Sequence, residues 1–407
     1  MKRAATLLTA LSVCLMSAGC TLVSGNCPPS VPPAPHVRYE PVAWSALPGW
    51  TADQLPDAWP AFLDSCSVLG ARPEWQSICT EARNLDPRTA DLHEFFEQHF
   101  EAYSVQSETG RRREATGLVT GYYEPLLQGS RTRSDRFGTP LYSPPPDLLT
   151  VDLAALYPEL KGKRVRARVV GNRVVPYYSR ADLRQDVSLA GHELVWIDGA
   201  LNAFLLEVQG SGRVQLDDGE TIRVEYADQN GQPYRSIGRY LVDAHELTLD
   251  QATMPGIRAW AEAHPDRIDE LLNANPSVVF FREAPVGDPN EGPRGALGVP
   301  LTAGRSVAVD PASIPLGAPA FLATPLRPPA SAPGASADKQ GSGGQAATGT
   351  ALQRLVMAQD TGGAIHGPVR ADFFWGTGAS AGAAAGQMRE LGRIWLLWPK
   401  GYALPAR

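Results

Sequence analysis

The glycine-rich stretch from residue 355 to residue 382, LVMAQDTGGAIHGPVRADFFWGTGASAG, constrains the fold of this chain most. Its glycines are Gly362, Gly363, Gly367, Gly376, Gly378 and Gly382. They are too frequent for a helix interior, where each glycine costs stability relative to alanine. Glycine suits tight turns and places where the backbone approaches a ligand closely. The stretch is therefore predicted to form turns beside a ligand rather than a helix.

Two aspartates in this stretch are candidates for acid–base chemistry. Asp360 follows an apolar run, and Asp372 comes twelve residues later, directly before Phe373-Phe374-Trp375. A carboxyl group beside so much apolar surface is desolvated, which raises its pKa and favours the protonated form that can act as an acid. Arg370 opposes this effect if it faces the same carboxyl. The alternative from these residues alone is that both aspartates are turn residues.

The first nineteen residues have the pattern of a secretion signal. Lys2 and Arg3 precede an apolar segment over residues 4–16, and small residues lie directly before Cys20. The apolar segment is too short to span a membrane stably. Residues 27–35 (CPPSVPPAP) are rich in proline and predict an extended tether.

The rest of the 407-residue chain is long enough for two domains with ample core. Residues 46–115 are predicted to be helical, because apolar residues recur there at helical spacing: Leu92, Phe95, Phe96, Phe100 and Tyr103. From Leu118 onward, alternating segments such as 165–170, 194–197, 204–209 and 221–226 predict β-strands. Two helices are predicted over residues 248–265 and 266–273. Residues 325–350 cannot bury a core and predict a disordered loop.

Charge and metal-ligand spacing exclude several classes of function. The formal net charge of −6 gives no reason to expect a nucleic-acid partner, and it disfavours long-range attraction to an anionic polymer. The seven histidines show no HExxH spacing and the five cysteines no CxxC pair. Neither a metal site nor another cofactor is predicted.

Several motifs occur in the order found in the membrane-bound lytic murein transglycosylase A family, and the resemblance extends from about residue 46 to the end. They are GLVTGYYEPLL (117–127), EVQGSGRVQL (207–216), YRSIGRYLVD (234–243), NPSVVFF (275–281), SVAVDPASIPLG with Asp310, AQDTGGAI with Asp360 and RADFFWG with Asp372. The last three resemble the three-aspartate (3D) domain that ends members of this family. Several ordered motifs over such a span are a far more specific signal than a single DTG or QGSG.

The resemblance implies a mainly β fold. Two halves of the chain would form one six-stranded double-psi β-barrel with a helical N-terminal part, and a second, β-rich domain would be inserted between them. A glycan strand would lie in a groove between the two domains. The implied division is 1–19 signal peptide, 20–45 tether, 46–127 helical segment and first part of the barrel, 128–283 inserted domain, and 284–407 remainder of the barrel.

The resemblance also implies the reaction. A lytic transglycosylase cleaves the bond between N-acetylmuramic acid and N-acetylglucosamine in peptidoglycan and closes a 1,6-anhydro ring, so that one carboxyl can act as both acid and base. Family correspondence assigns that role to Asp372, with Asp360 and Asp310 in support. The expected substrate contacts are Thr120, Gly121, Tyr122, Tyr123, Gln209, Ser211, Gly212, Gly363 and Trp375. Core or rim packing is the alternative for the tyrosines, and Trp375 either stacks on a sugar or shapes the pocket. His366 stands where the family often has lysine, which would make a charge contact there dependent on pH.

The cysteines indicate the compartment. Cys20 after small residues resembles a bacterial lipoprotein box, and Thr21 in place of aspartate implies the outer membrane, facing the periplasm. The alternative is simple secretion with Cys20 left as a thiol. Cys66 and Cys79 are then candidates for a disulfide in an oxidising compartment, and Cys27 is the odd one. Partner proteins of wall synthesis or division are not readable from the sequence.

Parts of the sequence also fit three other functions. Asp360-Thr361-Gly362 imitates the DTG signature of aspartic proteases, but these need two such carboxylates and no second DTG or DSG occurs. A barrel of this shape could instead bind wall polymers without cutting them, because fold does not dictate chemistry. A hydrolase could use Asp360 and Asp372 together, and its products would carry reducing ends.

Overall fold

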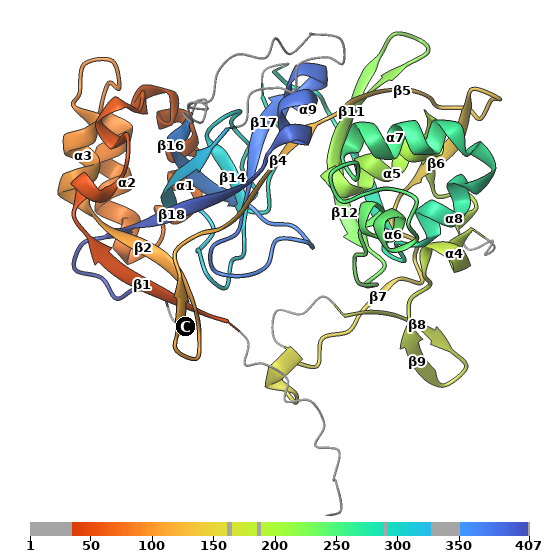
Figure 1. Cartoon of the computed structure of the whole chain (residues 1–407), viewed down its shortest axis with the longest axis horizontal. Helices are drawn as coiled ribbons and strands as arrows, with labels where there is room; N and C mark the ends of the chain where they lie inside the picture. The colour runs from red at the N-terminus through yellow and green to blue at the C-terminus, as the bar shows by residue number, and fades with distance from the viewer. Residues whose placement is uncertain (1–34, 161–164, 185–188, 289–290, 327–350, 406–407) are drawn as a thin grey trace, which may run out of the picture. The chain divides into compact units, whose positions relative to one another are not determined.

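The fold is described from a computed structural model, which covers residues 35–160, 165–184, 189–288, 291–326 and 351–405. Residues from Pro35 onward form one compact unit of three sheets and surrounding helices (Figure 1). The structure confirms the prediction of a mainly β chain. The double-psi barrel and the domain boundaries stay predictions at this point. The signal peptide, Cys20, Cys27 and nearly all of the predicted loop 325–350 lie outside the described residues.

The first sheet combines strands from both ends of the chain. Its strands are β1 (His36–Val42), β2 (Phe100–Thr109), β3 (Arg112–Glu114), β4 (Gly117–Glu124), β14 (Ser306–Val309), β15 (Pro319–Pro325), β16 (Ala351–Asp360), β17 (Ala371–Thr377) and β18 (Arg389–Pro399). The hydrogen-bonded order is β1-β2-β18-β15-β16-β14-β17-β4, β3 pairs with β2, and β18 also pairs with β4.

The pairing of these strands brings the two aspartates together. In β14, Ala308 lies opposite Asp372 of the antiparallel β17 and also opposite Asp360 of the parallel β16. On its other side β17 runs parallel to β4, where Thr120 is the partner of Asp372. Asp360 and Asp372 therefore lie at the same level of the sheet, on the two strands that flank β14.

Three helices near the N-terminus cover part of this sheet: α1 (Trp59–Leu69), α2 (Pro73–Asn84) and α3 (Leu92–His99), preceded by short 3-10 turns η1 (Trp44–Ala46), η2 (Trp50–Ala52) and η3 (Leu55–Asp57) (Figure 1). Their aromatic residues pack into the same core as Phe321 and Trp395. The helical prediction for 46–115 is wrong after His99. Residues 100–109 form β2, whose first residues alternate between buried Phe100 and Ala102 and an exposed Glu101.

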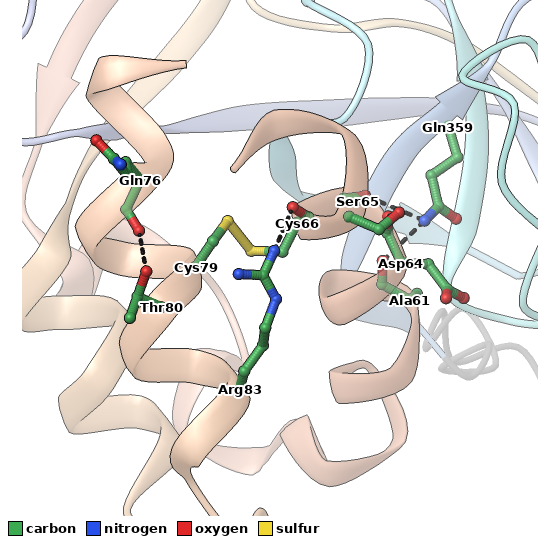
Figure 2. Close-up of a disulfide and its surroundings, with 10 residues drawn as sticks. Ala61, Asp64, Ser65, Cys66, Gln76, Cys79, Thr80, Arg83 and Gln359 are labelled. Carbon is green, nitrogen blue, oxygen red and sulfur yellow. Dashed lines mark hydrogen bonds between the residues drawn. A yellow bond between two sulfur atoms is a disulfide. The ribbon is translucent and has the colours of Figure 1, made fainter. Parts of the chain in front are cut away.

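The predicted disulfide is present and joins α1 to α2. Cys66 and Cys79 are bonded, and Nη2 of Arg83 donates to the carbonyl oxygen of Cys66 at 3.0 Å (Figure 2). On the other side of α1, Nε2 of Gln359 donates to the carbonyl oxygen of Ala61 at 2.8 Å. Gln359 is buried and directly precedes Asp360, so buried hydrogen bonds attach α1 to the strand that carries this aspartate.

The described residues in the middle of the chain form the other two sheets and five α-helices. The six-stranded sheet contains β5 (Leu126–Ser130), β6 (Phe137–Tyr142), β10 (Glu193–Asp198), β11 (Ser211–Leu216), β12 (Thr221–Gln229) and β13 (Val279–Ala284). The small sheet contains β7 (Leu149–Thr150), β8 (Arg166–Val170) and β9 (Arg173–Pro176). The helices are α4 (Arg180–Leu183), α5 (Ala200–Gln209), α6 (Ile237–Asp243), α7 (Met254–Ala263) and α8 (Ile268–Asn273), with 3-10 turns η4 (Pro158–Leu160) and η6 (Pro265–Arg267). The last two α-helices confirm that two helices lie within residues 248–273, but α7 begins at Met254, after an N-cap at Thr253, rather than at residue 248.

Two local predictions, one in the middle of the chain and one near its start, are wrong. Residues 204–209 lie in α5 rather than in a strand, because Leu201, Phe204 and Leu205 recur at helical spacing and pack in one hydrophobic cluster. Residues 36–42, predicted as tether, form β1, since Val37 and Tyr39 alternate toward the core.

A third prediction is wrong at the end of the glycine-rich stretch, where α9 (Gly378–Gln387) is a helix. Its five alanines favour helix, and its small residues let it lie close to β4 and β17. A Cβ atom on Gly382 would lie 2.7 Å from the ring of Tyr123. Close packing of the helix on β4 therefore requires glycine there.

Candidate functional site

Asp372 lies beside Thr120 on the paired strands β17 and β4. Oγ1 of Thr120 donates a hydrogen bond to Oδ1 of Asp372 at 2.7 Å. Among the described residues, Oδ2 of Asp372 has no hydrogen-bond donor, and the side chain is partly exposed. Asp372 therefore presents one fixed and one free carboxyl oxygen.

The surroundings of Asp372 favour its protonated form. Burial raises its pKa above the ordinary value, while the Thr120 hydrogen bond and the positive charge of Arg370 lower it in part. Arg370 is held by its backbone neighbours, since Nη1 donates to the carbonyl oxygens of Leu118 (3.3 Å) and Ala371. The predicted desolvation is thus present, and so is the opposing effect of Arg370.

Asp360 has a different environment, in which both of its oxygens accept hydrogen bonds. The backbone N–H of Ala296 donates to Oδ1 at 2.9 Å, and the Tyr122 hydroxyl donates to Oδ2 at 3.0 Å. Burial raises the pKa of Asp360 to about 6, opposed by these bonds and by the N–H of Thr361, with a smaller rise from the charge of Asp372. Burial and both carboxylates raise the pKa of Tyr122 well above its usual value. Tyr122 therefore stays a donor, and Asp360 is a fully engaged acceptor.

Asp310 fixes the loop that joins these two aspartates. Its Oδ2 accepts from the backbone N–H of Gly367 at 2.7 Å, and its Oδ1 accepts from the N–H of Ala312 at 3.0 Å. Gly367 has φ +102°, a conformation that side-chain-bearing residues rarely adopt. In the same loop, Nε2 of His366 lies 2.9 Å from the carbonyl oxygen of exposed Gly363. The geometry of Asp310 is that of a loop anchor.

Three of the expected substrate contacts lie on the opposite face of these strands. A Cβ atom on Gly121 would lie 2.6 Å from Nε1 of Trp375, and the Trp375 ring lies 5.1 Å from that of Phe373. Tyr123 packs on α9. Successive side chains of a strand point to opposite faces, so these residues do not share a face with Thr120, Tyr122 and Asp372. Although Trp375 is close to Asp372 in sequence, its ring lies on the other face of the sheet. There it lines an apolar cavity of about 310 Å³ with Leu326, Met388 and α9.

The three expected contacts from the middle of the chain lie at the junction of α5 and β11. Oε1 of Gln209 accepts from the backbone N–H of Tyr123 at 3.0 Å, which ties α5 to β4. Gly212 lets β11 pass close to Leu206 and Pro125, because a Cβ there would lie 2.3 Å from Leu206 Cδ1. Ser211 is partly exposed. In the structure, Gln209 and Gly212 serve packing and backbone contacts.

A buried charge cluster that the sequence did not predict lies at the end of β4. Glu124 is fully buried and accepts from Nε of Arg223 at 2.8 Å and from Nε of Arg213 and Oγ1 of Thr377 at 2.9 Å each. Both arginines also donate to the carbonyl oxygen of Glu291. The only sequence signal was an acidic residue directly after a strand-like GYY. The cluster connects β4, β11, β12 and β17.

Two further observations bear on cofactors and membranes. Among the residues that the structure describes, no group of three or more His, Cys, Asp or Glu side chains could hold a metal ion. Within the same residues, no helix has the length and apolar character needed to cross a membrane.

Comparison with known domain families gives two matches along the chain. Residues 118–282 match the MltA specific insert domain, and residues 305–398 match the 3D domain. The chain is 34% identical over 283 residues to membrane-bound lytic murein transglycosylase A of Escherichia coli strain K12. This alignment spans 68% of the chain and 64% of that relative, slightly less than two thirds of its length.

Comparison with solved structures covers nearly the whole chain. The monoclinic crystal structure of MltA from Neisseria gonorrhoeae is 34% identical, with a TM-score of 0.73 over 93% of this chain and 98% of that one. The crystal structure of E. coli MltA with bound chitohexaose is 27% identical, with a TM-score of 0.63 over 89% of this chain and 94% of that one. The match to the 3D domain covers β16 and β17, the strands that hold Asp360 and Asp372.

Proposed function

This chain belongs to the MltA family, and from that premise we propose that it is a lytic murein transglycosylase with Asp372 as its single acid/base. The proposed substrate is the glycan strand of peptidoglycan. The proposed products are strands that end in 1,6-anhydromuramic acid. Similarity to proteins named lytic murein transglycosylases supports the activity, and similarity to an MltA structure holding chitohexaose supports a glycan ligand.

The observation that carries the choice of Asp372 is its free oxygen. Asp360 and Asp372 both lie in desolvating surroundings that raise their pKa values. Both oxygens of Asp360 are occupied by donors, whereas Oδ2 of Asp372 meets none among the described residues. A general acid must offer its proton to the substrate within hydrogen-bond reach. Of the two, Asp372 is the carboxyl that can do so without breaking a hydrogen bond within the protein.

The proposed reaction needs no second carboxylate. Protonated Asp372 donates its proton to the glycosidic oxygen, and the bond from that oxygen to C1 of N-acetylmuramic acid breaks. The C6 hydroxyl oxygen of the same sugar then bonds to C1, and the Asp372 carboxylate takes the proton that this hydroxyl loses. Asp372 ends protonated, as it began. Thr120 stabilises the carboxylate form between the two steps, because its hydroxyl donates to Oδ1.

We propose that Asp360 and Tyr122 hold the site in shape rather than react. The Tyr122 hydroxyl and the Ala296 N–H fix Asp360, which lies at the same level of the sheet as Asp372. Asp310 would keep the intervening loop in place. Thr120, Gly363 and Ser211 remain proposed substrate contacts, and Gly121, Tyr123, Gln209, Gly212 and Trp375 would act by supporting the strands.

We also propose the six-stranded double-psi barrel, with the glycan groove between it and an inserted domain. Support for the barrel comes from pairing: β4, β17, β14, β16, β15 and β18 pair in succession, and β18 pairs back to β4 with Leu391 opposite Leu118. Support for the insertion comes from the second sheet, whose strands run from β5 to β13, close to the proposed boundaries of 128–283. Lipidation at Cys20 and an outer-membrane location facing the periplasm stay proposals from the sequence.

Mass spectrometry of muropeptides released from purified sacculi tests the function. The parent protein without its signal, with Cys20→Ala to avoid lipidation, is compared with the same protein carrying Asp372→Asn. Asparagine keeps the shape of the side chain but cannot donate an acidic proton. We expect 1,6-anhydromuramic ends from the parent and at least about a hundredfold lower release from the variant.

Other outcomes separate the rival functions. Products with reducing ends from the parent would establish a hydrolase, and Asp360→Asn would then abolish release as well. Binding to sacculi without release by either protein would establish a wall-binding domain and refute the enzyme. Full activity of the Asp372→Asn protein would refute the role of Asp372.

A further inference from the structure

Arg370 stands next to the proposed acid with most of its hydrogen-bonding capacity unused. Its Nη1 is held by the carbonyl oxygens of Leu118 and Ala371, which fixes the plane of the guanidinium. Its Nε and Nη2 meet no acceptor among the described residues, and the side chain forms no salt bridge there. The side chain is only partly buried. A guanidinium fixed at one nitrogen and open at two is suited to bind an oxygen-bearing group from solution.

The position of Arg370 relates it to the reacting sugar. Arg370 directly precedes β17, two residues before Asp372, and its guanidinium donates to the carbonyl oxygens of Ala371, the neighbour of Asp372, and of Leu118 on the adjacent β4, which also carries Thr120. The charge of Arg370 lowers the pKa of Asp372, which places the guanidinium within electrostatic reach of the carboxyl. Arg370 is the only cationic side chain found to act on that carboxyl in the described part of the chain. A sugar bound at Asp372 would therefore lie beside Arg370.

The two sugars of the proposed substrate differ in the group at C3, and a guanidinium can bind only one of the two groups through a carboxyl oxygen. N-acetylmuramic acid carries a lactyl ether at C3, whose carboxyl group is free or joined to a peptide, and N-acetylglucosamine has a hydroxyl there. The reacting sugar in the proposed mechanism is N-acetylmuramic acid. The chain has a net charge of −6, so recognition of such an arm depends on short-range contacts.

We propose that Arg370 is a specificity-determining residue that binds the lactyl carboxyl oxygens of the N-acetylmuramic acid at Asp372. Nε and Nη2 donate to the two oxygens of a free lactyl carboxylate, or to the single carbonyl oxygen that remains when the lactyl group is joined to a peptide. Peptidoglycan glycan is thereby preferred over chitin oligomers, which lack the arm. This inference rests on the proposed function, because it assumes a muramoyl sugar beside Asp372.

Binding measurements in the Asp372→Asn protein test the inference without cleavage. In that background no carboxyl at position 372 can titrate, so a loss of affinity on changing Arg370 cannot arise through the pKa of Asp372. Three ligands are compared by calorimetry: chitohexaose, a peptide-bearing muramoyl tetrasaccharide, and the same tetrasaccharide after amidase removal of the peptides. The variants are Arg370→Ala and Arg370→Lys. Arg112→Ala is the matched control, because Arg112 is 79% exposed on β3.

We expect Arg370→Ala to weaken binding of both muramoyl ligands by about tenfold or more, as for loss of a hydrogen bond from a charged donor. Binding of chitohexaose should change by less than about twofold, because no bond is lost. The affinity of Arg370→Lys for the muramoyl ligands should lie between those of the parent side chain and Arg370→Ala, since lysine keeps the charge without the planar fork of the guanidinium. Arg112→Ala should leave all three affinities unchanged.

Equal losses for all three ligands would show a structural role and overturn the proposal, and so would unchanged affinity for the muramoyl ligands. A loss confined to the peptide-bearing ligand would move the contact to the peptide and overturn the lactyl assignment. Release of anhydro products from sacculi by the parent tests the proposed function separately. If the parent cuts and the ligand preference of Arg370→Ala is unchanged, only this inference fails. If the parent neither cuts nor binds muramoyl ligands, both fail.

Discussion

The hydrogen bond from Thr120 to Asp372 should set the pH range in which the protein is active. Replacing Thr120 with valine removes the hydroxyl that donates to Oδ1 at 2.7 Å and keeps the shape of the side chain. That bond stabilises the carboxylate more than the neutral acid, so its loss raises the pKa of Asp372 above its already raised value. The acid must be protonated to start the reaction, and its rate falls as pH rises through this pKa. The variant should therefore stay active to higher pH.

The size of the effect follows from the bond that is lost. A hydrogen bond to a charged group contributes about 1.5–3 kcal/mol. The lower end applies here because Asp372 is partly exposed and water can replace part of the interaction. Since about 1.36 kcal/mol corresponds to one pH unit, the falling limb of the profile should move upward by about one unit.

The assay is the rate of solubilisation of purified sacculi as a function of pH, for the parent protein, Thr120→Val and Thr120→Ser. The serine variant keeps a hydroxyl and should follow the parent. An unchanged or downward-shifted falling limb for Thr120→Val would refute the reasoning. So would a serine variant that behaves like the valine variant, because the effect would then not depend on the hydroxyl.

Two further predictions concern stability. Glu124→Gln should lower the free energy of unfolding, measured by urea titration, by about 3–5 kcal/mol, because Arg213 and Arg223 lose a buried counter-charge. The control is Glu283→Gln at the exposed pair with Arg131, which should lower it by less than about 1 kcal/mol. Equal effects of the two changes would contradict the importance of burial. The double variant Cys66→Ala/Cys79→Ala should cost about 3 kcal/mol, as expected for a cross-link between residues 13 apart, and a reductant should lower the melting temperature of the parent but not of the variant.

The sequence predicted those features that depend on local pattern or on ordered motifs. Thr120 and Tyr122 of the TGYY motif donate hydrogen bonds to Asp372 and Asp360, whereas Gly121 and Tyr123 lie on the opposite face of the strand. Cys66 pairs with Cys79 as predicted. The extent of the helical segment was overestimated, because Phe100 and Tyr103 also fit the helical spacing of the preceding apolar residues. Tertiary pairing of β2 with β1 and β18 decides the conformation there.

Other features of the site depend on contacts between residues far apart in the chain. Thr120 meets Asp372 across 252 residues, through a parallel pairing that no local pattern specifies. The face on which Trp375 lies follows from strand alternation, which its closeness in sequence to Asp372 concealed. The burial of Glu124 could not be expected from sequence, because acidic residues are rarely buried unless they are paired, and its partners lie 89 and 99 residues away.

The environment of Asp360 differs from that of Asp372 in a way that supports the proposal that only one of these two desolvated aspartates reacts. Burial raises the pKa of Asp360 from 3.8 to about 6, so folding favours its protonated form. The native state then binds more protons than the unfolded chain between these values, and stability falls as pH rises through this range, by up to about 3 kcal/mol. Donors from Ala296, Thr361 and Tyr122 limit this cost by stabilising the anion. Asp372 has one side-chain donor, Thr120, and its other oxygen meets no donor among the described residues, so that oxygen is available to the substrate in the proposed mechanism.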